Sequence, residues 1–150
     1  MFFGTGVKAG DLVDGSTHRP QYMYSVTGLV RQKPSNVKLG VPVQVNGKSI
    51  SLFKYKEELF AIASKCPHQG GPLGASKDIE EIEVDGEGDI CVKCPWHKYR
   101  FSLLDGSGIG NTYAAEVYPV RVQASERFPS GECFVGFTAI DSTMFSSEDF

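Results

Sequence analysis

Two short segments of the chain, Cys66-Pro67-His68 and Cys94-Pro95-Trp96-His97, each carry one thiol and one imidazole, and 25 residues separate them. Thiolates and imidazoles are ligands that proteins use for zinc and for iron–sulfur clusters. Two such segments that serve one metal centre must meet in space. This requirement constrains the fold more than any other feature of the sequence, and it predicts two loops held side by side.

The residues before the first segment have the pattern of short strands. Residues 41–45 alternate valine with other residues before an Asn46-Gly47 turn, and Pro42 in this run indicates an edge strand or a strand start. Residues 56–58 mark another turn, and residues 59–63 form a short apolar strand. Turns about every ten residues predict a small antiparallel sandwich or barrel.

Between the two segments we expect a hairpin with arms at 82–84 and 90–92 and a turn at 85–88. Strand-like residues return at 117–122 and 134–137, and no helix-length amphipathic pattern interrupts them. The interpretation is one all-β domain over residues 1–150. Residues 1–23 are read as an irregular N-terminal arm, and residues 138–150 as a frayed acidic tail.

The composition is that of a globular protein, with 41% hydrophobic residues and a net charge of −3. This charge is too small to favour nucleic acid or a membrane surface as a partner. No run approaches the roughly 18 apolar residues of a membrane span, and residues 1–20 lack the apolar stretch of a secretory signal, so we expect none. We expect a monomer in a reducing, cytoplasmic compartment, with an organelle left open.

The sequences CPHQGGPL (66–73) and CPWHKYRFSLLDGSG (94–108) resemble the two cluster loops of the Rieske family. The resemblance extends over about residues 24–137 and is greatest to the small stand-alone Rieske-type ferredoxins. It implies an all-β Rieske fold in which a base domain carries a small cluster-binding insert, residues 64–108. It also implies one [2Fe–2S] cluster, with Cys66 and Cys94 on one iron and His68 and His97 on the other.

Ligation by two histidines has a physical consequence for redox chemistry. Four thiolates would leave the oxidised cluster with a charge of about −2, whereas two neutral imidazoles in place of two thiolates bring it to about zero. A less negative cluster accepts an electron more readily. The free ring nitrogens also titrate, so the potential is expected to fall as the pH rises.

Other metal sites were weighed against this interpretation. A Cys2His2 set also suits structural zinc, but GGPL and the Lys-Tyr-Arg-Phe run are not typical of zinc fingers. Cys91 and Cys94 form a Cys-x-x-Cys pair, yet no βαβ pattern surrounds them, so Cys91 and Cys133 are interpreted as structural thiols. An oxygenase iron needs two further histidines and a carboxylate, and only His18 remains.

The respiratory members of the family provide a second contrast. Their loops are joined by a disulfide at positions that hold Gly71 and Trp96 here, and their second loop donates hydroxyls where this chain has Tyr99 and Phe101. Fewer donors predict a low potential for a Rieske centre. Many members also carry a proline-bearing third loop, and residues 113–116 at that place contain no proline.

We therefore expect an electron-transfer ferredoxin with no catalytic site of its own, reduced by a flavoprotein and serving an oxygenase or another oxidoreductase. The alternatives are the small subunit of a larger oxidoreductase, such as a nitrite reductase, and a redox-sensing module. Charge suggests the docking side: a basic collar near the loops, opposed by an acidic flap over residues 78–89. The expected collar residues are Lys65, Lys93, Lys98 and Arg100.

Overall fold

The computed structural model describes residues 1–17, 22–24, 26, 28, 30–32, 39–67, 69–76, 79–84, 86–96 and 98–137. In this part the regular elements are strands and two 3-10 turns, η1 (Ala9–Asp11) and η2 (Leu73–Ala75), without an α-helix. The all-β prediction is confirmed. None of the described segments forms a helix of the length and apolar character that a membrane crossing requires.

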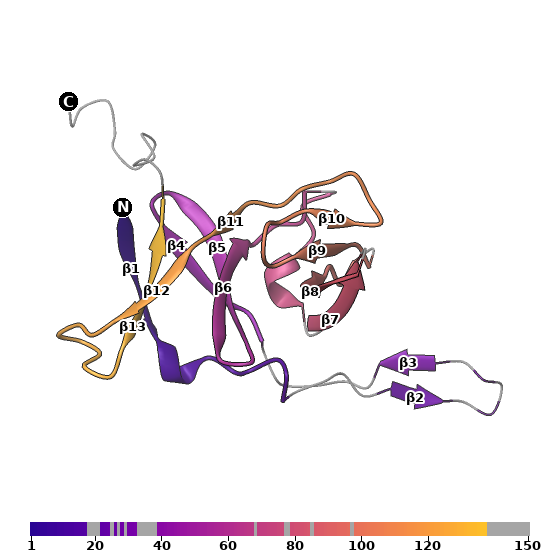
Figure 1. Ribbon diagram of the computed structural model, residues 1–150, viewed down its shortest axis with the longest axis horizontal. Helices are drawn as coiled ribbons and strands as arrows, with labels where there is room; N and C mark the ends of the chain where they lie inside the picture. The colour runs from indigo at the N-terminus through magenta and orange to yellow at the C-terminus, as the bar shows by residue number, and fades with distance from the viewer. Residues whose placement is uncertain are drawn as a thin grey trace.

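The described strands pair antiparallel in several sheets (Figure 1). The central sheet has the order β11 (Val117–Tyr118), β6 (Glu58–Ala63), β5 (Lys48–Tyr55), β4 (Val41–Val45). A second sheet has the order β10 (Gly108–Ile109), β9 (Arg100–Ser102), β8 (Glu87–Lys93), β7 (Ile79–Val84). A third joins β1 (Phe2–Lys8), β13 (Glu132–Gly136) and β12 (Val120–Gln123), and β2 (Tyr22–Tyr24) pairs with β3 (Val30–Gln32).

The hairpins of the central sheet follow the predicted turn chemistry. Asn46 and Gly47 have φ of 51° and 72°, so two left-handed residues close the β4–β5 hairpin. Lys56 and Glu57 close the β5–β6 hairpin in the same way, with φ of 49° and 67°. Strand β4 lies at the sheet edge, which confirms the interpretation of Pro42.

The hairpin between the two loops is longer than the sequence suggested. Val84 pairs with Glu87, so the turn holds two residues rather than the four expected at 85–88. The arms run over Ile79–Val84 and Glu87–Lys93 instead of 82–84 and 90–92. Gly86 has φ of 82°, and its left-handed conformation lets the strands pair up to the turn.

Strand β5 has an apolar core on each of its faces. Ile50 and Leu52 pack in one core with residues of β13, while Phe53 and Tyr55 pack in a second core. Successive side chains of a strand point to opposite faces, which explains this division. The second core contains Cys66 and Cys94, so the central sheet supports both cysteine loops directly.

The prediction of an irregular N-terminal arm was wrong for residues 2–8. Strand β1 pairs with β13, and its odd-numbered residues are half-buried. Gly4 and Gly6 interrupt the alternation of apolar residues, so the sequence pattern did not indicate a strand here. Gly4 is required there because a Cβ would lie 2.3 Å from Oε2 of buried Glu132, which accepts a hydrogen bond from the Gly6 N–H at 3.2 Å.

Asp14 fastens the segment after β1 to the central sheet. Its Oδ1 accepts hydrogen bonds from the Ser16 hydroxyl at 2.6 Å and from the Lys56 N–H at 2.9 Å, and its Oδ2 accepts from the Glu57 N–H at 3.0 Å. These bonds hold the pKa of Asp14 well below its usual range, with the Ser16 hydroxyl the largest cause. The carboxylate thus stabilises a turn built from two non-glycine left-handed residues. The acidic tail at 138–150 lies outside the described residues.

Candidate metal centre

The first cysteine loop is a closed turn between paired residues. Lys65 forms a β-bridge with Pro72, and between them the Cys66 N–H donates to the Gly71 carbonyl at 2.7 Å. The Gly70 N–H donates back to the Cys66 carbonyl at 2.8 Å. Gly70 has φ of 69°, so the turn passes through one left-handed residue four positions after the cysteine.

The second cysteine loop repeats this turn. Lys93 pairs with Arg100, the Cys94 N–H donates to the Tyr99 carbonyl at 2.8 Å, and the Lys98 N–H donates to the Cys94 carbonyl at 3.0 Å. Lys98 is left-handed with φ of 63°, again four positions after the cysteine. Two segments of different sequence therefore present a cysteine on the same backbone frame.

The two loops face each other, as the sequence predicted. A Cβ built on Gly71 would lie 3.0 Å from Sγ of Cys94 and 3.2 Å from the Trp96 ring. Cys66 and Cys94 are 3% and 1% exposed and pack in one apolar core. Gly71 and Trp96 are also the positions that a disulfide joins in respiratory Rieske proteins, and their contact here matches that part of the resemblance.

The two predicted histidine ligands, His68 and His97, lie outside the described residues, as does His18. Among the described residues no three Cys, His, Asp or Glu side chains converge on one point. The residues that flank the two histidines are solvent-exposed: Pro67, Gln69, Trp96 and Lys98. Each loop therefore buries its thiol and exposes its tip.

The donor set fits an iron–sulfur cluster. Buried thiols in an apolar core are shielded from water, and a glycine stands where a side chain would press on Cys94 Sγ. Phe101 is fully buried in the same core. Its phenyl ring has no hydroxyl, so this position provides no hydrogen-bond donor to a bound cluster.

Residues 113–116, which stand where many family members have a proline-bearing third loop, lie against the second cysteine loop. Tyr113 contacts Tyr99 with ring centroids 5.7 Å apart. The segment is fixed because the Ala115 N–H donates to the Gly106 carbonyl at 2.8 Å and the Gly108 N–H donates to the Tyr113 carbonyl at 2.9 Å. An aromatic residue thus covers the side of the loop without a proline. The only indication of this contact in the sequence was a tyrosine in each segment, Tyr99 in the loop and Tyr113 in the segment that covers it.

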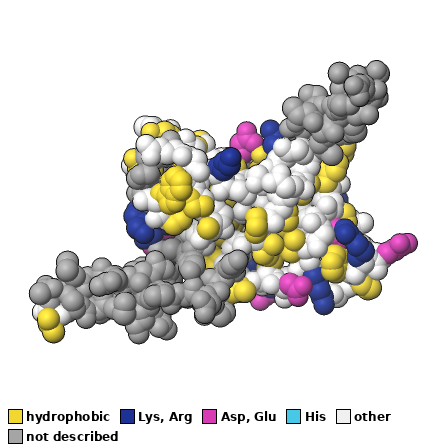
Figure 2. All heavy atoms as spheres, turned by 180° about the vertical axis from the view of Figure 1, so that it is seen from behind, with side chains coloured by type: hydrophobic (Ala, Val, Ile, Leu, Met, Phe, Trp, Pro, Cys, Tyr) yellow, Lys and Arg dark blue, Asp and Glu magenta, His cyan; other side chains and the backbone are white. Residues whose placement is uncertain are grey.

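Two of the four residues in the predicted basic collar, Lys93 and Arg100, are paired with a carboxylate. Glu80 of β7 pairs with Lys93 at 3.6 Å and with Arg100 at 3.2 Å, so the base of the acidic hairpin neutralises two of the four collar residues. The register of the three strands brings these side chains together. On the face shown in Figure 2, basic and acidic side chains of the described residues stand singly among apolar and neutral ones.

The remaining two cysteines are buried away from the loop tips. Cys91 lies on β8 and Cys133 on β13, at 1% and 0% exposure, and neither forms a disulfide within the described part of the chain. Burial, together with the Glu132 carboxylate, raises the pKa of the Cys133 thiol. These positions agree with structural roles.

Comparison with known proteins places these features in a family. A family model described as soluble Rieske-type ferredoxin matches residues 33–124. A human Rieske domain-containing protein is 34% identical over 98 residues, which are 65% of this chain and 59% of that protein. This chain therefore spans about three-fifths of the human relative.

Two further similarities are to bacterial proteins. A Ralstonia ferredoxin component of naphthalene 1,2-dioxygenase/salicylate 5-hydroxylase systems is 28% identical over 85 residues, covering 55% of this chain and 73% of that protein. A Mycobacterium tuberculosis structure, described as the small subunit of an NADH-dependent nitrite reductase, superposes with a TM-score of 0.61 at 21% identity. That match covers 93% of this chain and 97% of the other, and it shows a shared fold.

Proposed function

The chain belongs to the soluble Rieske-type ferredoxin family, an iron–sulfur family of electron transport, and we propose that it carries single electrons on one [2Fe–2S] cluster. Cys66 and Cys94 would hold one iron, and His68 and His97 the other. The observation that carries the proposal is the pair of matching turns that face each other, each with a buried cysteine at the same position.

In this proposal, some residues of the chain shield the thiols from water and others leave the loops accessible to a partner. The central sheet and the fully buried Phe101 keep the two thiols in an apolar core. The described residues on either side of His68 and His97 are exposed, so a partner can approach the loop tips. A bound [2Fe–2S] cluster with two imidazole ligands supplies a site that accepts and returns one electron at a potential above that of an all-cysteine cluster.

The test of this proposal is the composition and spectrum of the purified protein. We expect a red-brown protein with about two irons and two acid-labile sulfides per chain, the content of a [2Fe–2S] cluster. The reduced form should give a rhombic electron paramagnetic signal with a low average g. A colourless protein with stoichiometric zinc would overturn the assignment.

The histidines are tested by replacing them. His68→Cys or His97→Cys adds negative charge to the centre, so either variant should lower the potential or abolish assembly. His18→Cys serves as the matched control, because His18 lies outside both motifs, and it should leave the potential unchanged. A potential that is the same in all three variants would remove the histidines from the ligand set.

The potential itself is expected near the low end of the Rieske range, at about −150 mV. The reason is that Phe101 and the missing loop disulfide provide fewer contacts that stabilise the reduced state. Phe101→Tyr should raise the potential if the new hydroxyl reaches a ligand. A wild-type potential above zero at neutral pH would show that other donors compensate.

A carrier of single electrons needs one protein that donates the electron to it and another that accepts the electron from it. We propose a flavoprotein reductase as donor and an oxygenase or another oxidoreductase as acceptor, with the ferredoxin acting as a cytoplasmic monomer. The shared fold with a nitrite reductase small subunit favours one second candidate, a small subunit of a larger enzyme. Tight co-purification with a large subunit from the native source would favour this second candidate, and rapid reduction of the isolated chain by a captured reductase would favour the carrier.

A further inference from the structure

Each cysteine loop exposes one lysine. Lys65 stands directly before Cys66, and Lys98 lies four residues after Cys94, and both are exposed. Neither lysine forms an ion pair within the described part of the chain. Their positive charges are therefore available to a molecule that approaches the loop tips.

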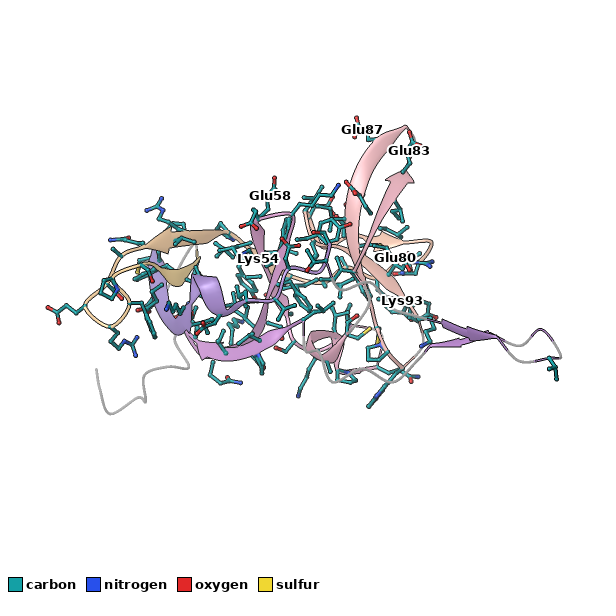
Figure 3. All side chains as sticks on the ribbon, turned by 90° about the horizontal axis from the view of Figure 1, so that it is seen from below. Lys54, Glu58, Glu80, Glu83, Glu87 and Lys93 are labelled. Atoms are coloured by element: carbon teal, nitrogen blue, oxygen red, sulfur yellow. The ribbon has the colours of Figure 1, made fainter. Side chains whose placement is uncertain are left out.

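The other two basic residues near the loops, Lys93 and Arg100, form ion pairs. Glu80 holds Lys93 at 3.6 Å and Arg100 at 3.2 Å, and Figure 3 shows Glu80 and Lys93 together at the loop end of the β7–β8 hairpin. Lys93 and Arg100 close the second loop, and Glu80 neutralises them. Lys65, which closes the first loop opposite Pro72, and Lys98 of the second loop keep positive charges that no described carboxylate pairs with.

The backbone of Lys98 adds an independent observation. Lys98 is left-handed with φ of 63°, at the turn position where the first loop has Gly70. A residue with a Cβ is disfavoured in this conformation, and glycine is the ordinary solution. Lys98 therefore stands, beside the proposed metal centre, where glycine would be the less strained residue, and its exposed side chain adds a charge that glycine could not.

Trp96 supplies the apolar part of the same surface. Its side chain is 59% exposed, and its ring lies against Gly71 of the facing loop. An exposed indole at the contact of two loops that each carry an exposed lysine matches the composition of a protein interface, in which aromatic residues are enriched at the centre.

The acidic end of the molecule lies elsewhere. Figure 3 shows Glu83 and Glu87 at the turn of the β7–β8 hairpin, away from Glu80 and Lys93. Glu87 begins β8 and Lys93 ends it, so the strand separates them by about 20 Å at roughly 3.4 Å per residue. The charge on the hairpin turn therefore does not cancel the charge on the loop tips.

We propose that Lys65, Trp96 and Lys98 form the surface on which a redox partner docks, and that the partner presents carboxylates around an apolar centre. This inference rests on the proposed function, since an electron carrier must bring its partner close to the metal centre. Opposite charges would steer the approach and orient the tip toward the partner.

Trp96 provides a direct measurement because it is the only tryptophan in the chain. Iodide should quench its fluorescence more strongly than caesium in the holoprotein. Lys98→Gln should lower the iodide quenching constant about twofold at low ionic strength, from the loss of one charge nearby. Glu80→Gln should raise that constant, because it frees Lys93 and Arg100. Lys8→Gln on β1 is the matched control and should change nothing.

Electron transfer is measured with small oxidants of opposite charge. One electron passes from the reduced protein to ferricyanide, giving ferrocyanide, or to hexaamminecobalt(III), giving cobalt(II). Lys65→Gln and Lys98→Gln should each slow the ferricyanide reaction about fivefold at 10 mM ionic strength, and the effect should vanish in 1 M salt. The reduction potential should stay nearly constant.

Three results separate the hypotheses. Equal quenching by iodide and caesium, with ferricyanide rates unchanged in both lysine variants, would overturn the docking surface. A faster reaction with the cobalt complex, slowed by Glu87→Gln, would place docking on the acidic hairpin turn instead. A protein without iron and sulfide would overturn the ferredoxin assignment and the redox role of the surface, even with the iodide preference intact.

Discussion

The two cysteine loops share a backbone frame and differ in what occupies it. In both, the cysteine N–H donates to the carbonyl five residues on, and the residue four positions after the cysteine is left-handed. The first loop fills these positions with Gly71 and Gly70, and the second fills them with Tyr99 and Lys98. The frame is therefore common to both loops, and the side chains are specific to the surroundings of each.

The surroundings explain the difference at the fifth position. Gly71 faces Cys94 Sγ and Trp96, where a Cβ would fit only if its neighbours moved by a few tenths of an ångström. Tyr99 stands on the other side of the pair and packs against Tyr113. One loop is shaped by close contact with its partner loop, and the other by a covering segment from the chain that follows it.

The largest effect is expected when the cysteine of either loop is replaced, which tests whether the two loops contribute equally to the metal centre. Cys66→Ser and Cys94→Ser should each reduce bound iron to near zero, because each loop contributes one of the two thiolates in the proposed site. Cys91→Ala is the matched control, a buried cysteine on β8 outside the turn, and should retain about two irons per chain. Iron and sulfide analysis gives the answer. A loop whose serine variant keeps the rhombic signal would not be equivalent to the other.

A second test concerns the closest contact between the loops. Gly71→Ala should lower the free energy of unfolding by about 1–3 kcal/mol, because the new methyl group overpacks the space beside Cys94 Sγ and Trp96. Gly88→Ala is the control, since a Cβ at this strand position meets nothing within 4 Å. Urea unfolding midpoints compare the two. Equal midpoints would mean that the loops move apart freely.

The sequence identified the loops but not their equivalence. Cys-x-His and Cys-x-x-His have different spacings, and nothing in the identity of Lys98 announces a left-handed residue. The Asn46-Gly47 turn and the edge strand at Pro42 were predictable because both depend on local backbone preferences. The contact between Gly71 and Trp96 is a matter of tertiary packing, to which only the family resemblance pointed.

Other features depended on long-range pairing and were missed or misread. Strand β1 was read as irregular because Gly4 and Gly6 interrupt its alternation, although the buried Glu132 carboxylate explains why Gly4 stands there. The pairing of Glu80 with Lys93 and Arg100 follows from the register of three strands, and no local pattern reports that register.

A third test addresses the cover of the second loop. Tyr113→Leu should cost about 0.5–1.5 kcal/mol of stability, the range for an aromatic pair, and should speed the release of iron to a chelator. Tyr113→Phe is the matched control because it keeps the ring and removes only the hydroxyl. If Tyr113→Leu and Tyr113→Phe release iron at the same rate as the wild type, the second loop needs no cover, and its difference from the first loop lies only in the turn residues.

The smallest expected effect exchanges the left-handed residue itself. Lys98→Gly keeps the left-handed backbone but removes the steric cost of about 1–2 kcal/mol that a residue with a Cβ has there, and it adds about 0.5–1 kcal/mol of chain entropy to the unfolded state. The net result should be a gain in stability of about 0.5 kcal/mol, read from urea unfolding midpoints. Lys98→Ala removes the same charge but keeps the Cβ, so it should show no gain. Both variants should lower the iodide quenching constant of Trp96 about twofold, as Lys98→Gln does. A stability gain in Lys98→Gly together with this weaker quenching would show that Lys98 provides charge at a backbone cost, whereas the first loop meets the same backbone demand with glycine. A Lys98→Gly variant less stable than Lys98→Ala would instead mean that the turn accommodates the Cβ without strain.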